Sequence, residues 1–412
     1  MPIIAGSLKD ELIRMLEEDE TEAKKRERSE LDRLAAPLGS SIVLFGAGGL
    51  GQITLRGLRK CGIEPVAFVD NNRALWDKAV AGVKVMSPES AAAAYGRKAA
   101  FVVTIWRAQG GYRFSDLVKQ LNALGCERIL SFGYLFWKYA EAFLPYYAID
   151  LPHKTLQQSE SILDAFEIWG DEQSRLEFVS QVKWRLTLDF DCLGVPVDQG
   201  QYFPDDLFAL CDDEIFIDCG AFDGDTVVDF IDRRQSRFQK IVAFEPDPRN
   251  KDALNECIAN MPPGIGQKIE VHPLGLGARR EMAGFDAGGS AGSSLNESGE
   301  TQIEIASLDE VMGTLKPTYI KMDIEGAEPD ALTGSATIIR KYRPILAFSV
   351  YHQFDHLWKL PLLVRSFYDG YRFFLRAHGQ EGWDLVCYAV PAGRLAETIL
   401  PRVGKTEELF EL

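Results

Sequence analysis

The sequence predicts an α/β protein with two Rossmann-like, doubly wound sheets. Strand-like and helix-like segments alternate along most of the 412 residues, and this order is typical of parallel sheets with helices on both faces. Glycine-rich turns at 46–51 and 220–224 each follow a short apolar run. Because one hydrophobic core rarely serves a chain of this length, we expect at least two domains.

The first segment, residues 1–37, is predicted to be a charged helical arm. Residues 8–35 are dense in charge, and their leucines have the spacing of a helix with a narrow apolar stripe. Such a helix can pack on the body of the protein, pack on a second subunit or stay in solvent. The sequence leaves these alternatives open, and with them the question of a homo-oligomer.

Residues 38–150 are predicted to form a Rossmann-like nucleotide-binding domain. Strands and helices alternate there in the order expected of a parallel sheet. The predicted elements are strands at 41–45, 65–69, 100–105 and 128–131, and helices that end near 61 and span 114–124.

Four residues of this domain are candidate nucleotide-binding residues. Gly46, Gly48 and Gly51 have the dinucleotide spacing, and Asp70 ends the next strand. Such a turn offers backbone N–H groups to a phosphate, and the acid can accept a ribose hydroxyl. Two short stretches, Gly-Ala-Gly-Gly and Phe-Val-Asp-Asn, are similar to the nucleotide-sugar-binding domains that precede some sugar acetyltransferases. That similarity implies a nucleotide or nucleotide-sugar ligand.

Residues 151–214 are predicted to form a helical connection or cover. Two helices are expected between 156 and 190, because apolar side chains there recur at helical spacing. Further along, the stretch 287–294 is rich in glycine and serine. It is either a loop that closes over bound substrate or a plain hairpin connection.

The composition argues against polyanionic partners. The 45 basic and 61 acidic residues give a net charge of -16, which opposes binding to nucleic acid and to anionic membrane surfaces. We therefore expect no nucleic-acid partner, and no apolar run is long enough for a membrane span. The seven cysteines are odd in number and form no Cys-x-x-Cys pair, which fits a reducing compartment. We expect a cytoplasmic protein.

The second glycine turn has the features of a nucleoside site. An apolar strand from Ile215 runs into Asp218, and the chain then turns at Gly220 and Gly224. Glycine lets the backbone turn sharply and lets a ligand approach it, while the next helix directs free N–H groups at an anionic end. A neighbouring strand ends at Glu245, whose carboxylate can accept both hydroxyls of a ribose.

The spacing of this turn favours one cofactor class. Asp-x-Gly-x-x-x-Gly differs from the Gly-x-Gly-x-x-Gly of dinucleotide enzymes, and the difference favours S-adenosylmethionine over NAD. The candidate cofactor-binding residues are Asp218, Gly220, Ala221, Gly224, Asp225, Thr226, Glu245 and Pro246.

A series of short stretches, taken in order, resembles the FkbM family of S-adenosylmethionine-dependent O-methyltransferases. The stretches are Phe216–Gly220, Phe244–Pro246, Ser307–Asp309, Ile320–Glu328, Arg343–Pro344 and Leu375–His378. The resemblance implies a class I methyltransferase fold for residues 215–412, with S-adenosylmethionine as cofactor. It also implies methyl transfer to a hydroxyl of a small acceptor, a sugar or a nucleotide-linked sugar, with His378 on the acceptor side.

Four residues are candidate catalytic residues. Asp323 ends a strand, Glu325 and Glu328 lie in the turn after it, and His352 follows the next strand. Methyl transfer from a sulfonium requires an aligned acceptor oxygen and removal of its proton, by a base or with a metal that lowers the hydroxyl pKa. The three acids could also hold Mg²⁺ or Mn²⁺ through oxygen ligands. The sequence leaves metal dependence open.

Two other functions stay open at this point. The turn at Gly46 to Gly51, together with Asp70, also suits an NAD-linked sugar-nucleotide oxidoreductase. A non-enzymatic nucleotide-sensing or scaffold protein is the other alternative. It would be favoured if Asp218 and Glu245 bound no ligand.

Overall fold

The structure is a computed structural model in which residues 5–36, 41–107, 112–197, 200–286, 294–295, 299 and 301–396 are described. The chain divides into two compact units. The first unit consists of Met1–Val197, Val350–Lys359 and Leu375–Leu385, and the second consists of Asp198–Ser349, Leu360–Phe374 and Val386–Leu412. Each unit contains a largely parallel sheet, so the predicted α/β class is confirmed.

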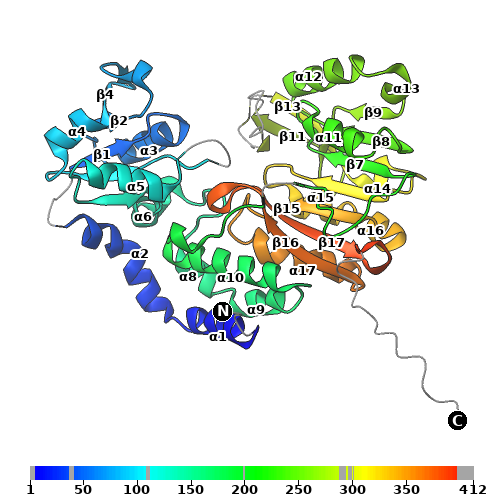
Figure 1. Cartoon of the computed structure of the whole chain (residues 1–412), viewed down its shortest axis with the longest axis horizontal. Helices are drawn as coiled ribbons and strands as arrows, with labels where there is room; N and C mark the ends of the chain where they lie inside the picture. The colour runs from blue at the N-terminus through cyan, green and yellow to red at the C-terminus, as the bar shows by residue number, and fades with distance from the viewer. Residues whose placement is uncertain are drawn as a thin grey trace, which may run out of the picture. The chain divides into compact units, whose positions relative to one another are not determined.

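The first unit is built around a six-stranded sheet in the order β3-β4-β2-β1-β5-β6, of which Figure 1 labels β1, β2 and β4. Its strands are β1 (Ile42–Phe45), β2 (Ala67–Val69), β3 (Ala79–Val80), β4 (Val83–Met86), β5 (Ala100–Val103) and β6 (Ile129–Ser131). All neighbours pair in parallel except β3 and β4. The helices that alternate with these strands are α3 (Gly49–Lys60), α4 (Pro88–Tyr95) and α5 (Phe114–Ala123). Strands β1 and β5 are buried along their whole length, as expected of parallel strands covered on both faces.

The predicted arm consists of two helices that pack on the body of the first unit. They are α1 (Ala5–Leu16) and α2 (Glu20–Ala35). The side chain of Asp19 accepts the N–H groups of Thr21 and Glu22, so it caps α2 and interrupts the single helix that the charge pattern predicts. Helix α1 contacts α9 (Ser159–Phe166) and α10 (Glu172–Thr187), and α2 contacts α6 (Phe132–Lys138) and α8 (Pro152–Leu156).

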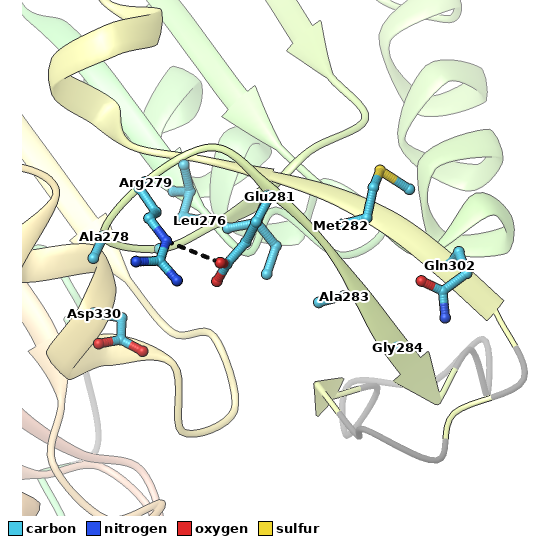
Figure 2. Close-up of a pocket in the computed structure, with 11 residues that line it drawn as sticks. Leu276, Ala278, Arg279, Glu281, Met282, Ala283, Gly284, Gln302 and Asp330 are labelled. Carbon is cyan, nitrogen blue, oxygen red and sulfur yellow. Dashed lines mark hydrogen bonds and ion pairs between the residues drawn. The ribbon is translucent and has the colours of Figure 1, made fainter.

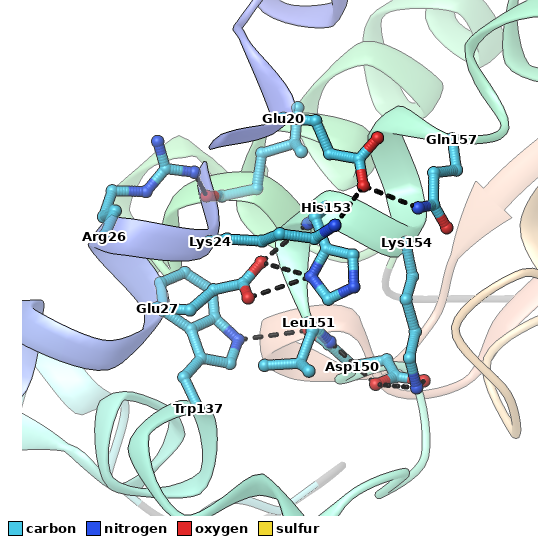
Figure 3. Close-up of polar contacts among 11 residues, drawn as sticks. Glu20, Lys24, Arg26, Glu27, Trp137, Asp150, Leu151, His153, Lys154 and Gln157 are labelled. Atoms are coloured by element: carbon cyan, nitrogen blue, oxygen red, sulfur yellow. Dashed lines mark hydrogen bonds and ion pairs between the residues drawn. The ribbon is translucent and has the colours of Figure 1, made fainter. Parts of the chain in front are cut away.

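A buried carboxylate fastens α2 to α8 (Figure 3). Glu27 is 3% exposed; it accepts the backbone N–H of His153 at 2.7 Å, and both of its oxygens lie 2.9 Å from His153 Nδ1. Gln157 donates to Glu20 at 2.8 Å. The Trp137 indole N–H donates to the Asp150 carbonyl at 3.1 Å. The arm is therefore an integral part of this unit.

Two segments from the C-terminal half of the chain also belong to the first unit. Arg376 donates to Asp171 at 2.6 Å. Trp106, just after β5, donates its indole N–H to the Glu381 carbonyl at 2.9 Å, and the Glu381 carboxylate accepts the Phe114 N–H at 2.5 Å. Short helices complete this unit, namely α7 (Ala140–Phe143), η1 (Arg73–Leu75), η2 (Phe190–Cys192) and η3 (Gln380–Gly382).

The second unit is built around a seven-stranded sheet in the order β16-β17-β15-β14-β7-β8-β9. Its strands are β7 (Ile215–Cys219), β8 (Lys240–Phe244), β9 (Ile269–His272), β14 (Tyr319–Met322), β15 (Ile345–Ser349), β16 (Tyr371–Ala377) and β17 (Leu385–Pro391). From β7 the chain adds strands outward to β9, then returns to place β14 on the other side of β7. Strand β17 pairs antiparallel with β15. The order reverses between β7 and β14, and open α/β sheets bind ligands at such a switch point, beyond the carboxyl ends of the strands.

The helices of the second unit follow the alternation that the sequence predicts. They are α11 (Asp225–Arg233), α12 (Pro248–Ala259), α13 (Pro263–Gly266), α14 (Leu308–Val311), α15 (Glu328–Thr333), α16 (Ala336–Tyr342), the greater part of α17 (His356–Phe367) and η4 (Ala392–Arg394). A smaller sheet lies beside them in the order β10-β13-β11-β12. Its strands are β10 (Gly275–Leu276), β11 (Glu281–Asp286), β12 (Ser294–Leu295) and β13 (Thr301–Ala306). Most of the glycine- and serine-rich stretch, residues 287–293, lies outside the described residues.

Within the described parts of the chain, every helix is too short or too polar to cross a membrane.

Candidate active site

The turn after β7 and the end of β14 touch at the switch point of the second unit. Gly220 has a φ of +92°, and a Cβ atom there would lie 2.0 Å from the carbonyl oxygen of Asp323. Any larger residue would separate the two strand ends. Gly224 has a φ of +95° and precedes α11, and a Cβ on it would lie 3.0 Å from the Leu254 side chain. The sequence needs glycine at both positions because of backbone conformation and close approach.

Backbone hydrogen bonds tie this turn to β8. The N–H groups of Gly220 and Ala221 both donate to the carbonyl of Phe244, at 3.1 and 3.0 Å. At the start of α11 the Asp225 carboxylate accepts the N–H of Thr226 at 2.6 Å. The turn is therefore fixed in shape by its neighbours, as a ligand-binding backbone should be.

Glu245 lies directly after β8, in contact with the turn. The residue is 5% exposed. Its carboxylate accepts the N–H of Phe222 at 2.9 Å on one oxygen and the N–H of Asp247 at 2.8 Å on the other. Burial raises the pKa of Glu245 to about 7, although these N–H groups oppose the rise. The Asn250 side chain also bonds this carboxylate, and because each carboxylate oxygen can accept two hydrogen bonds, acceptor capacity for a ribose hydroxyl is left. Pro246 follows Glu245 in the chain.

Asp218 and Lys321 form a buried ion pair between the central strands. Lys321 Nζ lies 3.0 Å from Asp218 Oδ1 and donates to the Gly220 carbonyl at 2.7 Å. Burial lowers the pKa of Lys321, but the carboxylates of Asp218 and Asp323 raise it, and the net direction is upward. Burial raises the pKa of Asp218, and Lys321 opposes that rise. Lys321 therefore stays protonated at neutral pH, and its hydrogen bond to the Gly220 carbonyl stabilises the glycine turn.

Asp323 follows β14 and is held by a tyrosine from a distant part of the sequence. The hydroxyl of Tyr202 donates to Asp323 Oδ2 at 2.6 Å. Glu325 and Gly326 have φ values of +53° and +103°, so the chain turns tightly after Asp323. Glu328 is buried and accepts the N–H groups of Ile324 and Gly326 at 3.0 and 3.1 Å. Glu328 thus shapes the turn, while Asp323 and Glu328 both offer hard oxygen ligands of the kind that Mg²⁺ binds.

The two histidines that the sequence singles out fall in the first unit. His352 is buried, and its ring centroid lies 4.3 Å from that of Tyr351 and 6.5 Å from that of Tyr147. His378 donates its backbone N–H to the carbonyl of Asp384 at 3.0 Å. It lies on the short loop between β16 and β17, where Glu381 and Asp384 have left-handed backbones.

The glycine turn of the first unit is also tightly built. Gly46 has a φ of +120°, and a Cβ on Gly51 would lie 1.8 Å from the Gly46 carbonyl oxygen. Asp70 accepts the N–H of Ala47 at 2.9 Å on one oxygen and of Asn72 at 2.8 Å on the other. Gly48 caps α3. A Cβ on Gly48 would lie 4.0 Å from the guanidinium of Arg107, a cation near the turn that sequence reasoning did not identify.

An open cleft of about 750 Å³ runs along the smaller sheet of the second unit. Figure 2 shows Arg279 and Glu281, joined by an ion pair of 3.0 Å, between Asp330 of α15 at one end and Gln302 of β13 at the other. Leu276 and Ile305 supply apolar surface. Charged, amide and apolar groups mixed in this way suit a small ligand rich in hydroxyl groups.

Comparison with known proteins agrees with this geometry. A family model described as methyltransferase FkbM domain matches residues 218–381. No curated protein matches the sequence. The crystal structure of methyltransferase FkbM from Methylobacillus flagellatus KT has a TM-score of 0.75 at 21% identity, over 93% of this chain and 99% of that chain. At that identity the likeness shows a shared fold.

Two further solved structures match less of the chain. Precorrin-6y C5,15-methyltransferase from Geobacter metallireducens GS-15 has a TM-score of 0.28 at 11% identity, over 45% of this chain and 84% of that one. The fibrillarin pre-rRNA processing protein of Methanococcus jannaschii has a TM-score of 0.27 at 13% identity, over 45% and 70%. The family match shows that this chain contains a methyltransferase FkbM domain over residues 218–381.

Proposed function

We propose that the chain is an S-adenosylmethionine-dependent O-methyltransferase that acts on a hydroxyl of a small acceptor. The observation that carries the proposal is the arrangement of Glu245, the glycine turn and Asp323 at three adjacent strand ends. The Glu245 carboxylate can still accept a hydrogen bond beside the preformed turn, as ribose binding requires. Asp323 supplies a carboxylate at the end of β14, where it can accept the proton of the acceptor hydroxyl.

The residues of the second unit fit the cofactor as follows. Glu245 accepts the ribose hydroxyls, and the backbone from Gly220 to Thr226 forms the wall against which the ligand lies. Lys321 keeps that wall in place through the Gly220 carbonyl. When bound, S-adenosylmethionine supplies a methyl group on a sulfonium, so the protein itself needs only to align the acceptor and remove a proton.

Asp323 is the proposed proton acceptor. Its position after β14, with one oxygen held by Tyr202, gives the carboxylate a fixed orientation, which general-base catalysis requires. Glu328 contributes to the backbone turn. Asp323 and Glu328 are the proposed ligands in the event that a divalent cation takes part. His352 is the alternative general base, and the variant His352→Ala tests that role beside Asp323→Asn.

A sugar is the proposed acceptor class, alone or linked to a nucleotide. The cleft along β11 and β13 supports this choice, because a guanidinium, two carboxylates and an amide line it. Such groups bind hydroxyls in pairs, and the apolar side chains there can cover a sugar ring. The acceptor would enter from this side of the second unit.

The experiment is methyl transfer from radiolabelled S-adenosylmethionine to a panel of free sugars, UDP-sugars and GDP-sugars. We expect labelled product with one class, and Asp323→Asn should lower turnover by roughly 10²-fold or more while the Kd for S-adenosylhomocysteine stays unchanged. His352→Ala measured beside it identifies the base if Asp323→Asn retains activity. Failure of the wild-type chain to bind S-adenosylhomocysteine would refute the proposal.

We further infer that the first unit binds a nucleotide or nucleotide sugar at Gly46, Gly48, Gly51 and Asp70. Support comes from the α3 N-terminus behind Gly48 and from the guanidinium of Arg107 near that glycine. Gly48→Val should abolish nucleotide binding and leave S-adenosylhomocysteine binding intact. A thermal-shift panel that includes NAD distinguishes the outcomes: NAD alone would favour the oxidoreductase alternative, and no ligand at all would favour a docking role.

A further inference from the structure

Tyr202 has a backbone conformation that the surrounding structure imposes. Its φ is +66°, a value that is a genuine outlier for a bulky side chain. Two buried tyrosines hold it there: Tyr388 accepts the Tyr202 N–H through its hydroxyl oxygen at 3.0 Å, and the Tyr319 hydroxyl donates to the Tyr202 carbonyl. Strain of this kind persists only where several contacts enforce it, and it concentrates at functional sites.

The side chain of Tyr202 connects the two charged elements of the second unit. Its hydroxyl donates to Asp323 Oδ2 at 2.6 Å. The face of its ring lies 5.2 Å from the ammonium of Lys321, within the range of a cation–π contact. Lys321 in turn pairs with Asp218 and holds the Gly220 carbonyl. One residue therefore touches both the proposed base and the cation that supports the cofactor turn.

We propose that Tyr202 is a positioning residue for methyl transfer, with separate tasks for its hydroxyl and its ring. The hydroxyl fixes the plane of the Asp323 carboxylate by bonding Oδ2, and so orients the carboxylate for proton removal from the acceptor. The ring packs on the Lys321 ammonium, which donates to the Gly220 carbonyl of the glycine turn. This inference rests on the proposed function of Asp323, and it adds the residue that sets its orientation.

The two tasks predict different outcomes for two substitutions. Tyr202→Phe keeps the ring, so the Kd for S-adenosylhomocysteine should not change, while kcat should fall by about 10-fold or more, the loss expected for a hydrogen bond to a charged group. Tyr202→Leu removes the ring as well, so it should lower kcat and also raise that Kd. Tyr371→Phe is the matched control, because it deletes another buried hydroxyl, one that donates to the Pro344 carbonyl at 2.7 Å. The control should leave both quantities unchanged.

A double-mutant cycle gives a readout that does not need activity. If Tyr202 acts through Asp323, the thermal unfolding midpoint of Tyr202→Phe/Asp323→Ala should equal that of Asp323→Ala alone, because Asp323→Ala already removes the acceptor of the Tyr202 hydroxyl. In kinetics this double variant should likewise be no slower than Asp323→Ala. Additive losses in both measurements, or wild-type kcat in Tyr202→Phe, would overturn the inference. A wild-type chain that binds no S-adenosylhomocysteine but still shows the coupled unfolding midpoints would refute the proposed function and leave the Tyr202–Asp323 contact established.

Discussion

If Glu245 binds the ribose as proposed, we predict that cofactor affinity depends on pH through its carboxylate. Its pKa is raised to about 7 by burial, so the side chain is largely protonated at pH 6 and largely ionised at pH 8. The ionised form can accept a ribose hydroxyl, whereas the protonated form has lost part of its acceptor capacity. Affinity for S-adenosylhomocysteine should therefore rise as pH rises through 7.

Substitution of Glu245 measures how much its carboxylate contributes to the affinity for S-adenosylhomocysteine. Removal of hydrogen bonds to a charged group costs about 1.5–3 kcal/mol, roughly a 10- to 150-fold rise in Kd. Glu245→Gln still accepts one of the two backbone N–H groups that Glu245 accepts now, so it tests the charge with less damage to the turn than Glu245→Ala. Its Kd should be high and equal at pH 6 and pH 8.

Isothermal titration calorimetry at pH 6, 7 and 8 measures this directly. Glu256→Ala is the matched control, because Glu256 is an exposed carboxylate on α12 of the same unit, and it should behave as wild type at every pH. A wild-type Kd that is constant across this range, together with a wild-type Kd in Glu245→Gln, would show that Glu245 does not contact the ligand.

Three further outcomes are expected. Gln302→Ala should raise the KM for the acceptor severalfold with kcat and cofactor Kd unchanged, and an unaltered KM would remove the cleft of Figure 2 from acceptor binding. Dialysis against EDTA should abolish activity, and Mg²⁺ or Mn²⁺ should restore it, only if Asp323 and Glu328 hold a cation; activity that survives the chelator assigns proton removal to a side chain alone. Glu27→Ala leaves the half-buried His153 N–H without its acceptor and should lower the free energy of unfolding by about 1–3 kcal/mol in urea. Substitution of the exposed Glu22 by Ala should stay within about 0.5 kcal/mol of wild type.

The buried parallel strands could be predicted because they read as continuous apolar runs. Strands β1, β5, β7, β14 and β15 all lie within a residue or two of the predicted positions. The short strand β3 at the sheet edge and its neighbour β4 could not be predicted, since a few partly exposed residues carry little signal. The arm was predicted as one helix because its charge pattern continues across Asp19, and only the capping geometry shows the break.

The sequence indicated those parts of the candidate active site that depend on local backbone conformation. Gly220 and Gly224 have the positive φ values that their spacing indicates, and Glu245 directly follows the neighbouring strand β8. Tyr202 could not be predicted, because its partner Asp323 lies 121 residues away in sequence and no local pattern marks the pair. Lys321 did carry a signal: a lysine inside a buried strand is rare unless it is paired, and that signal points to Asp218.

Photo-crosslinking of radiolabelled S-adenosylmethionine to the full-length chain, followed by peptide mapping, tests the central claim most directly. We expect one labelled region, in the peptides that contain Gly220 to Thr226 or Glu245, and loss of the label in the presence of excess unlabelled S-adenosylhomocysteine. Label confined to the peptides around Gly48 and Asp70, or label that the competitor fails to displace, would contradict a cofactor site at the β7–β14 switch point.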